Sequence, residues 1–475
     1  MTKSALFTDF YELTMAQGYW KRQINNPSVF DMFFRKQPFN GGFSVFAGLE
    51  PLIDIIEQFK FSGEDIEYLA SLNMFEKGFL DYLADFHFTG DLWAMDEGTI
   101  IFPNEPLIRV HTNVIEASVL EGLILNTVNF QSLIATKTAR IWLASNKGSI
   151  MEFGLRRAQG YDGAMSASRA AYIGGAAGTS NTQAGKKYGI PVLGTMAHSW
   201  VMSYPNEEEA FDAYAEQYPQ KSVFLIDTYN TLESGIQAAI KSGRKLVAKG
   251  LNFGVRLDSG DLQYLTTKVR EELDQAGLTE ATITVSNELT EEIVESLVLN
   301  KAPINSWGIG THMVTGGEES SFTGVYKLSA KTGPDGNLVP TMKLSDNPEK
   351  TTNPAVKQVW RLYHEDGTVK ADVIALDDER ILAGTCMRYY HPSNDYQSFS
   401  FNAAYTEPML SKKMSEGRRC VPQQNLPEIR SRVQAGLEKL DSTYRRILNP
   451  HIFKVSLTER IRNMKFGFLK EYGKM

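Results

Sequence analysis

Three basic side chains follow two predicted strands that lie close together in the sequence. An apolar run at 150–153 predicts a buried strand, and Arg156 and Arg157 come shortly after it. A second apolar run at 190–196 predicts another buried strand, and His198 follows that one. Because ligands bind at the carboxyl ends of parallel strands in α/β folds, this arrangement predicts an anion site at one edge of a sheet.

Each of these features also has a plain structural explanation. The two arginines could lie on a solvated strand end, and His198 could be a structural histidine whose ring nitrogens are satisfied by neighbours. The glycines between them, at positions 174, 175 and 178, could form only a tight turn. Their occurrence together in one short stretch favours the anion site.

The same pattern recurs further along the chain, where four more predicted strands end in polar residues or glycines. Arginine side chains and glycine-turn N–H groups are typical of phosphate sites, and aspartates suit a ribose hydroxyl or Mg²⁺. An imidazole beside a carboxylate suits proton or phosphoryl transfer. These residues predict an α/β enzyme that acts on a phosphorylated sugar. The strand-end candidates are Arg156, Arg157, Thr195, His198, Asp227, Arg256, Asp258, Asp261, Gly308, Gly310 and Thr311.

Strand and helix patterns alternate from residue 149 to about 320, and these elements must position the candidates. The alternation predicts a parallel sheet, either open or closed into a barrel. Before and after it the patterns are those of an antiparallel sheet with helices, including two hairpin signals after residue 320. We therefore expect three parts: residues 1–145 together with 320–400 as an α+β sandwich domain, 146–319 as the α/β catalytic domain, and 401–475 as a mostly helical segment.

Composition limits the function classes. The chain has 475 residues, 42% of them hydrophobic, so it can bury a large core. Its net charge of −7 argues against a nucleic-acid partner, and a phosphate site must therefore be a local basic cluster. We see no signal-peptide core near the start and no apolar run long enough for a membrane. With only Cys386 and Cys420, a disulfide framework is excluded, and we expect a cytoplasmic protein.

Seven longer motifs resemble the nicotinate phosphoribosyltransferase family, and together they extend over nearly the whole chain. They occur in the family's order, which makes a chance match implausible. The motifs are FTDFYELTMAQGYW at 7–20, FFRKQPF at 33–39, FGLRRAQG at 153–160, GTSNTQAG at 178–185, GTMAHS at 194–199, VRLDSGDL at 255–262 and GIGTHMVTG at 308–316.

The resemblance implies a reaction, a fold and an assembly. The reaction joins nicotinate to 5-phosphoribosyl 1-pyrophosphate, giving nicotinate mononucleotide and pyrophosphate, with ATP hydrolysis and Mg²⁺. The implied fold is an irregular α/β barrel with an open-faced antiparallel sandwich domain, here followed by a helical C-terminal extension. The implied assembly is a homodimer with shared active sites.

The resemblance also implies roles for the catalytic residues. His198 is expected to become transiently phosphorylated by ATP, with Asp227 as the carboxylate that orients its ring. Asp258 is expected to contact the ribose and Mg²⁺.

Two further sets are implied for substrate binding. For nicotinate, Tyr11 from the other subunit is expected to stack on the pyridine ring opposite Phe153. The nicotinate set is Tyr11, Phe153, Ser180, Thr195 and Arg256, and the phosphoribosyl pyrophosphate set is Arg35, Lys36, Arg156, Arg157, Gly308, Gly310 and Thr311.

Two alternatives stay open from the sequence. A catalytically silent sensor of nicotinate or a nucleotide would keep the fold, although it would lack His198, Asp258 or the phosphate glycines, and all are present. A nicotinamide-using relative is the second alternative. Ser180 bears on it, because an aspartate there would repel the carboxylate of nicotinate. Ser180 could also serve only to cap the helix that begins near Asn181.

Overall fold

The computed structural model describes residues 4–345, 350–394 and 396–472, and they divide into two compact units. Unit 1 comprises Met1–Leu133 and Ser321–Met475, and unit 2 comprises Ile134–Ser320. Helix α5 (Val114–Ala144) runs from unit 1 into unit 2, so this division begins unit 2 earlier than residue 146. The predicted division into three domains stays a prediction.

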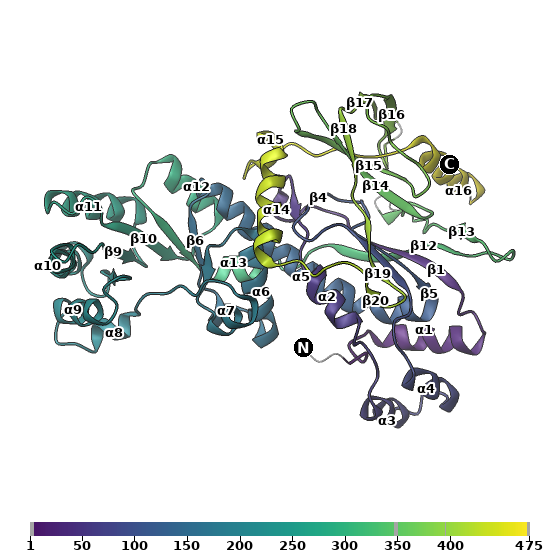
Figure 1. The fold of residues 1–475 in the computed structure, drawn as a ribbon, viewed down its shortest axis with the longest axis horizontal. Coiled ribbons are helices and arrows are strands. Elements are labelled where there is room, and N and C mark those ends of the chain that lie inside the picture. The colour runs from purple at the N-terminus through teal and green to yellow at the C-terminus, as the bar shows by residue number, and fades with distance from the viewer. Residues whose placement is uncertain (1–3, 346–349, 395, 473–475) are drawn as a thin grey trace. The chain divides into compact units, whose positions relative to one another are not determined.

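Unit 2 is built on a parallel sheet of six strands in the order β7-β6-β11-β10-β9-β8. Strands β6, β9 and β10 of this sheet are labelled in Figure 1. In the described residues no ladder joins β7 to β8, so the sheet is a curled half-barrel and not a closed ring. The α/β class that the alternation predicted is confirmed. The strands are β6 (Ser149–Glu152), β7 (Gly178–Thr179), β8 (Val223–Leu225), β9 (Gly254–Leu257), β10 (Thr282–Asn287) and β11 (Ser306–Ile309).

Helices alternate with the strands of unit 2, except that α7, α8 and α9 all lie between β7 and β8. Helix α11 shows why these helices form: Leu262, Val269 and Leu273 recur at helical spacing and are buried, and Asp261 accepts a hydrogen bond from Tyr264 N as the N-cap. Asp261 was one of the strand-end candidates, and its side chain has this structural role. The helices of the unit are α6 (Gly160–Gly174), α7 (Thr182–Tyr188), α8 (His198–Met202), α9 (Glu207–Gln217), α10 (Ile236–Val247), α11 (Leu262–Gln275), α12 (Glu291–Leu299) and α13 (Thr311–Thr315).

The strand predicted at 190–196 is wrong. Only an isolated bridge joins Val192 to Thr179, and the residues after it are irregular up to α8. Pro191 has no N–H to donate to a ladder, and Gly194 weakens an extended strand. His198 therefore begins a helix, whereas we expected it at the end of a strand.

Unit 1 contains two larger sheets and a two-stranded ladder between β2 (Ser44–Val45) and β4 (Ile100–Ile101). The seven-stranded sheet has the order β13-β12-β1-β5-β3-β19-β20, and the six-stranded sheet has the order β17-β16-β21-β15-β14-β18. The strands of the first are β1 (Pro27–Phe34), β3 (Asp91–Ala94), β5 (Ile108–Asn113), β12 (Gly324–Thr332), β13 (Leu338–Pro340), β19 (Ser411–Ser415) and β20 (Arg418–Arg419). Those of the second are β14 (Lys357–Tyr363), β15 (Val369–Leu376), β16 (Cys386–Tyr390), β17 (Ser398–Asn402), β18 (Tyr405–Pro408) and β21 (Val455–Leu457).

Both predicted hairpins are confirmed, as the antiparallel pairs β12–β13 and β14–β15. The helices of unit 1 are α1 (Phe10–Lys21), α2 (Leu49–Ile56), α3 (Gly63–Ser71), α4 (Lys77–Ala84), the first part of α5, α14 (Leu426–Lys439), α15 (Ser442–Arg445) and α16 (Glu459–Glu471). Among them, α1 to α4 and the first part of α5 share a large apolar core with the first sheet, whereas α16 packs on β15 and β16 of the second. No described helix is long and apolar enough to cross a membrane.

The expectation that 401–475 is mostly helical needs correction. Helices α14 to α16 occupy its later part, but 405–419 carries three short strands. The density of charge in this stretch hid them from a reading of the sequence. In the fold, Lys412 pairs with Asp91 at 2.7 Å, and Arg419 lies 2.7 Å from Glu50, so strand charges meet acids of neighbouring elements.

Candidate active site

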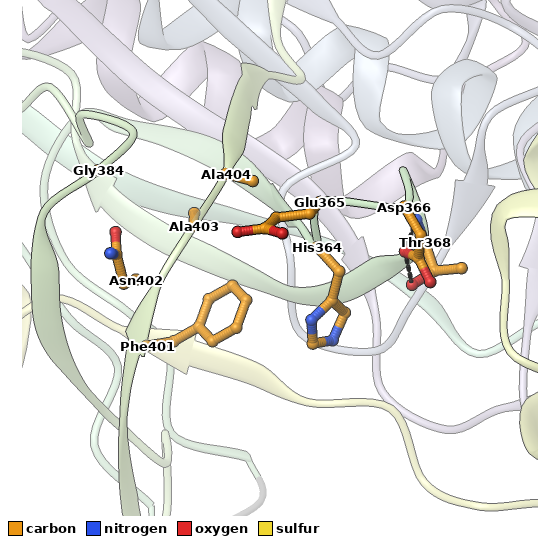
Figure 2. Close-up of a pocket in the computed structure, with 9 residues that line it drawn as sticks. All are labelled: His364, Glu365, Asp366, Thr368, Gly384, Phe401, Asn402, Ala403 and Ala404. Carbon is orange, nitrogen blue, oxygen red and sulfur yellow. Dashed lines mark hydrogen bonds between the residues drawn. The ribbon is translucent and has the colours of Figure 1, made fainter.

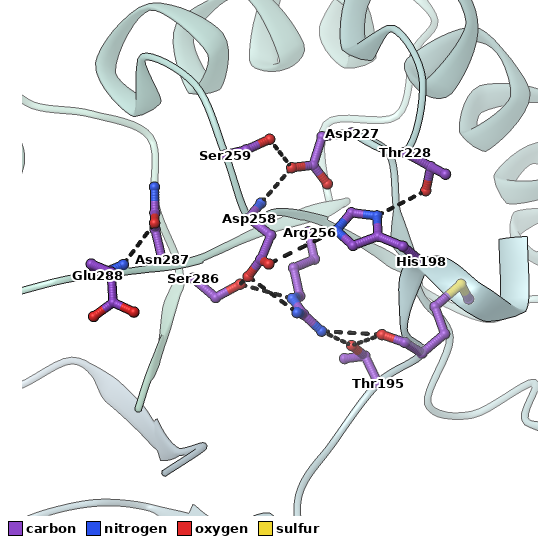
Figure 3. Close-up of polar contacts among 11 residues, drawn as sticks. Thr195, His198, Asp227, Thr228, Arg256, Asp258, Ser259, Ser286, Asn287 and Glu288 are labelled. Carbon is purple, nitrogen blue, oxygen red and sulfur yellow. Dashed lines mark hydrogen bonds and ion pairs between the residues drawn. The ribbon is translucent and has the colours of Figure 1, made fainter. Parts of the chain in front are cut away.

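Polar side chains gather where β8, β9 and β10 end, beside the loop that leads into α8 (Figure 3). Parallel pairing aligns these strand ends, because Arg256 of β9 lies opposite Leu225 of β8 and Thr284 of β10. The cluster comprises Thr195, His198, Asp227, Thr228, Arg256, Asp258, Ser259 and Ser286. Five of these eight were predicted as site residues.

Arg256 lies at the centre of the cluster. Its Nε donates to Ser286 Oγ at 2.8 Å, and its Nη2 donates to Asp258 Oδ1 at 3.2 Å. Its Nη1 donates to Thr195 Oγ1 at 2.6 Å and to the carbonyl oxygen of Met196 at 3.2 Å. A guanidinium has five N–H groups, so these four bonds leave one N–H of Nη2 without a partner among the described residues. The side chain is 12% exposed, and this remaining donor is what it can offer to a ligand.

One carboxylate oxygen of Asp258 accepts hydrogen bonds within the cluster, and the other is available to a ligand. Its Oδ1 accepts hydrogen bonds from both Arg256 and the hydroxyl of Ser286. Its Oδ2 lies 3.8 Å from His198 Nε2, and the side chain is about one-third exposed. Asp258 therefore keeps an oxygen for a ligand on the side of the imidazole.

The predicted pairing of Asp227 with His198 is not found, and this prediction needs correction. Asp227 Oδ2 accepts from the backbone N–H of Asp258 at 2.9 Å and from Ser259 Oγ at 2.6 Å. The His198 ring is instead held by Thr228, whose Oγ1 lies 3.1 Å from Nδ1. The side chain of Asp227 thus braces the turn after β9, and the neighbouring threonine orients the imidazole.

Phe153 covers the end of β11. Its ring lies 5.7 Å from the Arg256 guanidinium, measured from ring centroid to Cζ. A Cβ on Gly308 would meet Phe153 Cε2 at 2.7 Å, and one on Gly310 would meet the Phe153 carbonyl oxygen at 3.1 Å. Both glycines of the predicted phosphate cradle therefore also let Phe153 pack closely on β11.

Ser180 lies in the turn after β7, and Glu152 fixes this turn. The buried carboxylate of Glu152 accepts from the hydroxyl groups of Ser168 and Thr179 and from the N–H of Gly154, and the Glu152 carbonyl accepts from Ser180 N at 2.8 Å. The residue that caps α7 is Asn181, whose side chain accepts from Ala184 N. The alternative that Ser180 is the helix cap is therefore wrong.

The remaining phosphate candidates of unit 2 lie around the start of α13. Gly310 precedes α13, and Thr311 Oγ1 donates to Glu288 Oε1 at 3.1 Å. Arg156 and Arg157 form a short helical turn after β6 and are exposed. Neither arginine side chain has an ion pair in the part of the chain that the structure describes, so both are available to an anion.

Tyr11, Arg35 and Lys36 belong to unit 1. Tyr11 is about half exposed on α1. The backbone N–H groups of Arg35 and Lys36 bond to Thr323 at the end of β1. The roles of these three residues beside the cluster of unit 2 stay predictions.

Sequence reasoning missed four polar residues that shape the site: Glu152, Thr228, Ser286 and Glu288. Each lies in or directly after a predicted strand, which was the available signal. Their roles depend on which strands are neighbours and in what register, and the sequence pattern does not give that.

The acidic residues at this edge fit a Mg²⁺ ion that is held jointly with a substrate. Asp227 Oδ1 is buried and has no hydrogen-bond partner in the described structure, and Asp258 Oδ2 is available nearby. The described residues contain no group of three or more acidic, histidine or cysteine side chains placed to hold a metal. Since Mg²⁺ usually takes one or two carboxylates together with substrate phosphates and water, two carboxylates suit it.

A separate cleft of about 670 Å³ opens in unit 1 beside the turn of the β14–β15 hairpin (Figure 2). It is lined by His364, Glu365 and Phe401 among others, and the imidazole and phenyl rings lie 5.1 Å apart. It contains none of the predicted site residues.

Comparison with known proteins identifies the family. The N-terminal domain of nicotinate phosphoribosyltransferase (NAPRTase) matches residues 6–129, the NAPRTase family matches 149–371, and the C-terminal domain matches 356–465. The nicotinate phosphoribosyltransferase of Bacillus subtilis (strain 168) is 41% identical, over 96% of this chain and 93% of its own length. The Homo sapiens enzyme is 32% identical, over 96% of this chain and 95% of its own.

A solved structure supports the same assignment. The crystal structure of human nicotinic acid phosphoribosyltransferase superposes with a TM-score of 0.85, at 30% identity, over 97% of this chain and 99% of that one. Two family domains and one family match together extend over most of the sequence. The chain therefore belongs to the nicotinate phosphoribosyltransferase family, the enzymes of pyridine nucleotide biosynthesis that its own motifs resemble.

Proposed function

We propose that this chain joins nicotinate to 5-phosphoribosyl 1-pyrophosphate, giving nicotinate mononucleotide and pyrophosphate, and that it couples the transfer to hydrolysis of ATP. The activity rests on membership of the family. The observation that carries the assignment to residues is the cluster of His198, Arg256 and Asp258, in which Asp258 Oδ1 accepts from Arg256 and Asp258 Oδ2 lies 3.8 Å from His198 Nε2.

Nicotinate binds against Arg256 and Phe153 in this proposal. The free N–H of Arg256 Nη2 donates to the substrate carboxylate, a charge-assisted bond worth about 1.5–3 kcal/mol. Thr195 holds the other end of the guanidinium, and Phe153 offers an aromatic face to the pyridine ring. Tyr11 of a second copy closes the other face, and Ser180 supplies a hydroxyl where an aspartate would repel the acid.

The phosphoribosyl substrate binds across the strand ends. Asp258 Oδ2 contacts the ribose, and the turn at Gly308, Gly310 and Thr311 receives the 5′-phosphate with backbone N–H groups. The exposed Arg156 and Arg157, together with Arg35 and Lys36, neutralise the pyrophosphate. Mg²⁺, held by Asp227 and Asp258 with the substrate, would stabilise the charge of the leaving pyrophosphate.

The chemical step is a displacement at the anomeric carbon. The pyridine nitrogen forms a bond to that carbon as the bond to pyrophosphate oxygen breaks, with oxocarbenium character in the transition state. Stacking fixes the line of attack, because a ring held between two aromatic faces cannot tilt out of it. The arginines stabilise the charge that develops on the leaving oxygen.

His198 receives the γ-phosphoryl group of ATP in this proposal. Its side chain is 40% exposed, so a nucleotide can reach it, and Thr228 fixes the ring orientation. Water later cleaves the phosphohistidine to phosphate, so that the overall ATP reaction is hydrolysis to ADP and phosphate. A homodimer and a cytoplasmic location complete the proposal. The two free, exposed cysteines Cys386 and Cys420 agree with a reducing compartment.

An assay with labelled nicotinate and phosphoribosyl pyrophosphate tests the function directly. Labelled nicotinate mononucleotide should form, and ATP should increase its yield and be consumed in parallel. Nicotinamide replaces nicotinate in the control reaction. Product from nicotinamide alone would show the nicotinamide-using relative, and binding of nicotinate without any product would show the silent sensor.

A further inference from the structure

Ser286 closes a hydrogen-bonded ring with two residues that face different substrates. Arg256 Nε donates to Ser286 Oγ at 2.8 Å, the Ser286 hydroxyl donates to Asp258 Oδ1, and Arg256 Nη2 also donates to Asp258 Oδ1 at 3.2 Å (Figure 3). Ser286 is buried at the end of β10, so solvent does not compete for its hydroxyl. Because a serine hydroxyl has a single proton, its donation to Asp258 fixes the direction of the whole ring.

The ring decides which atoms of its members stay free. Ser286 accepts the hydrogen bond from Arg256 Nε, and one N–H of Nη2 has no partner among the described residues. On Asp258 the same hydroxyl occupies Oδ1, which leaves Oδ2 on the side of His198. Without Ser286, the carboxylate could rotate and the guanidinium could tilt, since each would lose a bond that fixes its plane.

We propose that Ser286 is a positioning residue that aligns the nicotinate site and the phosphoribosyl site with each other through Arg256 and Asp258. This inference rests on the proposed function and goes beyond it, because it assigns the alignment of two subsites to one hydroxyl group. Ser286 touches neither substrate in this arrangement, and its effect passes through the two charged residues.

The proposal predicts a specific pattern of non-additivity. Ser286→Ala should weaken nicotinate binding about tenfold, and Arg256→Lys should weaken it as well. If Ser286 acts through Arg256, the double variant should be little weaker than Arg256→Lys alone. The same cycle with Asp258→Asn should give the same pattern for phosphoribosyl pyrophosphate. If Ser286→Ala instead weakened binding through a general loss of packing, its effect on the dissociation constant would add to that of Arg256→Lys or Asp258→Asn.

The experiment measures dissociation constants by calorimetry, with nicotinate alone and with phosphoribosyl pyrophosphate and Mg²⁺ alone, so that no turnover occurs. Ser306→Ala is the matched control: Ser306 Oγ lies 2.8 Å from Thr284 Oγ1, between β10 and β11, and bonds to no residue of the ring. The control should bind both ligands as the unaltered chain does. Thermal unfolding of every variant shows whether it is folded.

The outcomes separate this inference from the proposed function. Non-additive losses in both cycles, with an unaffected Ser306→Ala, support the ring. Additive losses, or equal losses in the control, overturn it while the function stands. If the unaltered chain binds neither ligand, the proposed function fails, and the alignment of the two subsites fails with it.

Discussion

Replacing Gly308 with alanine tests whether the packing of Phe153 determines nicotinate binding. The new Cβ would lie 2.7 Å from Phe153 Cε2, 2.8 Å from Cδ2 and 3.2 Å from Ser286 Cβ. Unstrained carbon contacts need about 3.5–4.0 Å, so the ring must move by roughly 1 Å or rotate. Overpacking of this kind costs about 1–3 kcal/mol of stability. A displaced ring would also lose its face-to-face contact with the pyridine, which is worth about 0.5–1.5 kcal/mol.

These magnitudes translate into measurable kinetics. The lost stacking corresponds to a rise of roughly two- to tenfold in the KM for nicotinate, since 1.4 kcal/mol is tenfold. Thermal unfolding and steady-state assays with each substrate varied in turn measure both effects. Gly163→Ala is the matched control in the same unit, because its new Cβ would meet no atom closer than Gln159 Cβ at 3.8 Å. The control should keep both KM values and should be slightly more stable, as alanine suits a helix better than glycine.

Two results would refute this reasoning. An unchanged KM for nicotinate in a Gly308→Ala variant of lowered stability would show that Phe153 does not contact the pyridine. A rise confined to the KM for phosphoribosyl pyrophosphate would show that Gly308 serves the phosphate cradle, and that its closeness to Phe153 has no part in nicotinate binding.

Three further predictions concern other parts of the chain. Incubation with γ-labelled ATP should give an acid-labile, base-stable label that His198→Ala lacks, while that variant keeps some ATP-independent transfer; label persisting in the variant would remove His198 from the phosphoryl step. Ser180→Asp should lower kcat/KM for nicotinate and raise it for nicotinamide, and an unmoved ratio of the two would place specificity elsewhere. Burial raises the pKa of Glu12 from 4.5 to about 7, so the folded chain keeps a proton that the unfolded chain releases, and this residue lowers stability as pH rises from about 4.5 to 7. The free energy of unfolding of Glu12→Gln, relative to that of the unaltered chain, should therefore rise by up to roughly 3 kcal/mol from pH 4.5 to pH 8, as measured by urea unfolding. An equal difference between the two proteins at both pH values would contradict the raised pKa.

The alternating half of the fold could be predicted because its strands are buried on both faces. In β10 the consecutive residues Ile283, Thr284 and Val285 are all buried, so both faces of this strand are covered, and Val255 and Leu257 of β9 are fully buried as well. Where ion pairs hold a strand in place, the pattern of apolar residues did not predict it. Residues 405–419 carry strands whose lysines and arginines meet acids elsewhere in unit 1, whereas the sequence predicted a mostly helical segment there.

The sequence predicted where in the fold the site lies better than it predicted the contacts among the site residues. Arg256 and Asp258 lie at the shared edge where the parallel strands end, whereas His198 reaches this cluster from the start of α8 and not from a strand. The partner of His198 was predicted wrongly, since Asp227 and Thr228 are sequence neighbours, and only the path of the turn decides which of them faces the imidazole. The role of Ser286 depends on the register of β9 against β10, which a sequence pattern does not specify.

The geometry divides the handling of charge between two kinds of residue. Arg256 and Asp258 are largely satisfied by each other and by neutral hydroxyl groups, so the pair adds almost no net charge and can hold a fixed geometry. Arg156 and Arg157 are exposed and without ion pairs in the described residues, so they can follow a mobile, highly charged group. A transferase needs both, because the anomeric carbon must stay in line with the pyridine nitrogen while pyrophosphate moves away. Under the proposed function, this division also explains how a chain of net charge −7 can bind an anionic sugar, because two exposed arginines without ion pairs in the described residues follow β6.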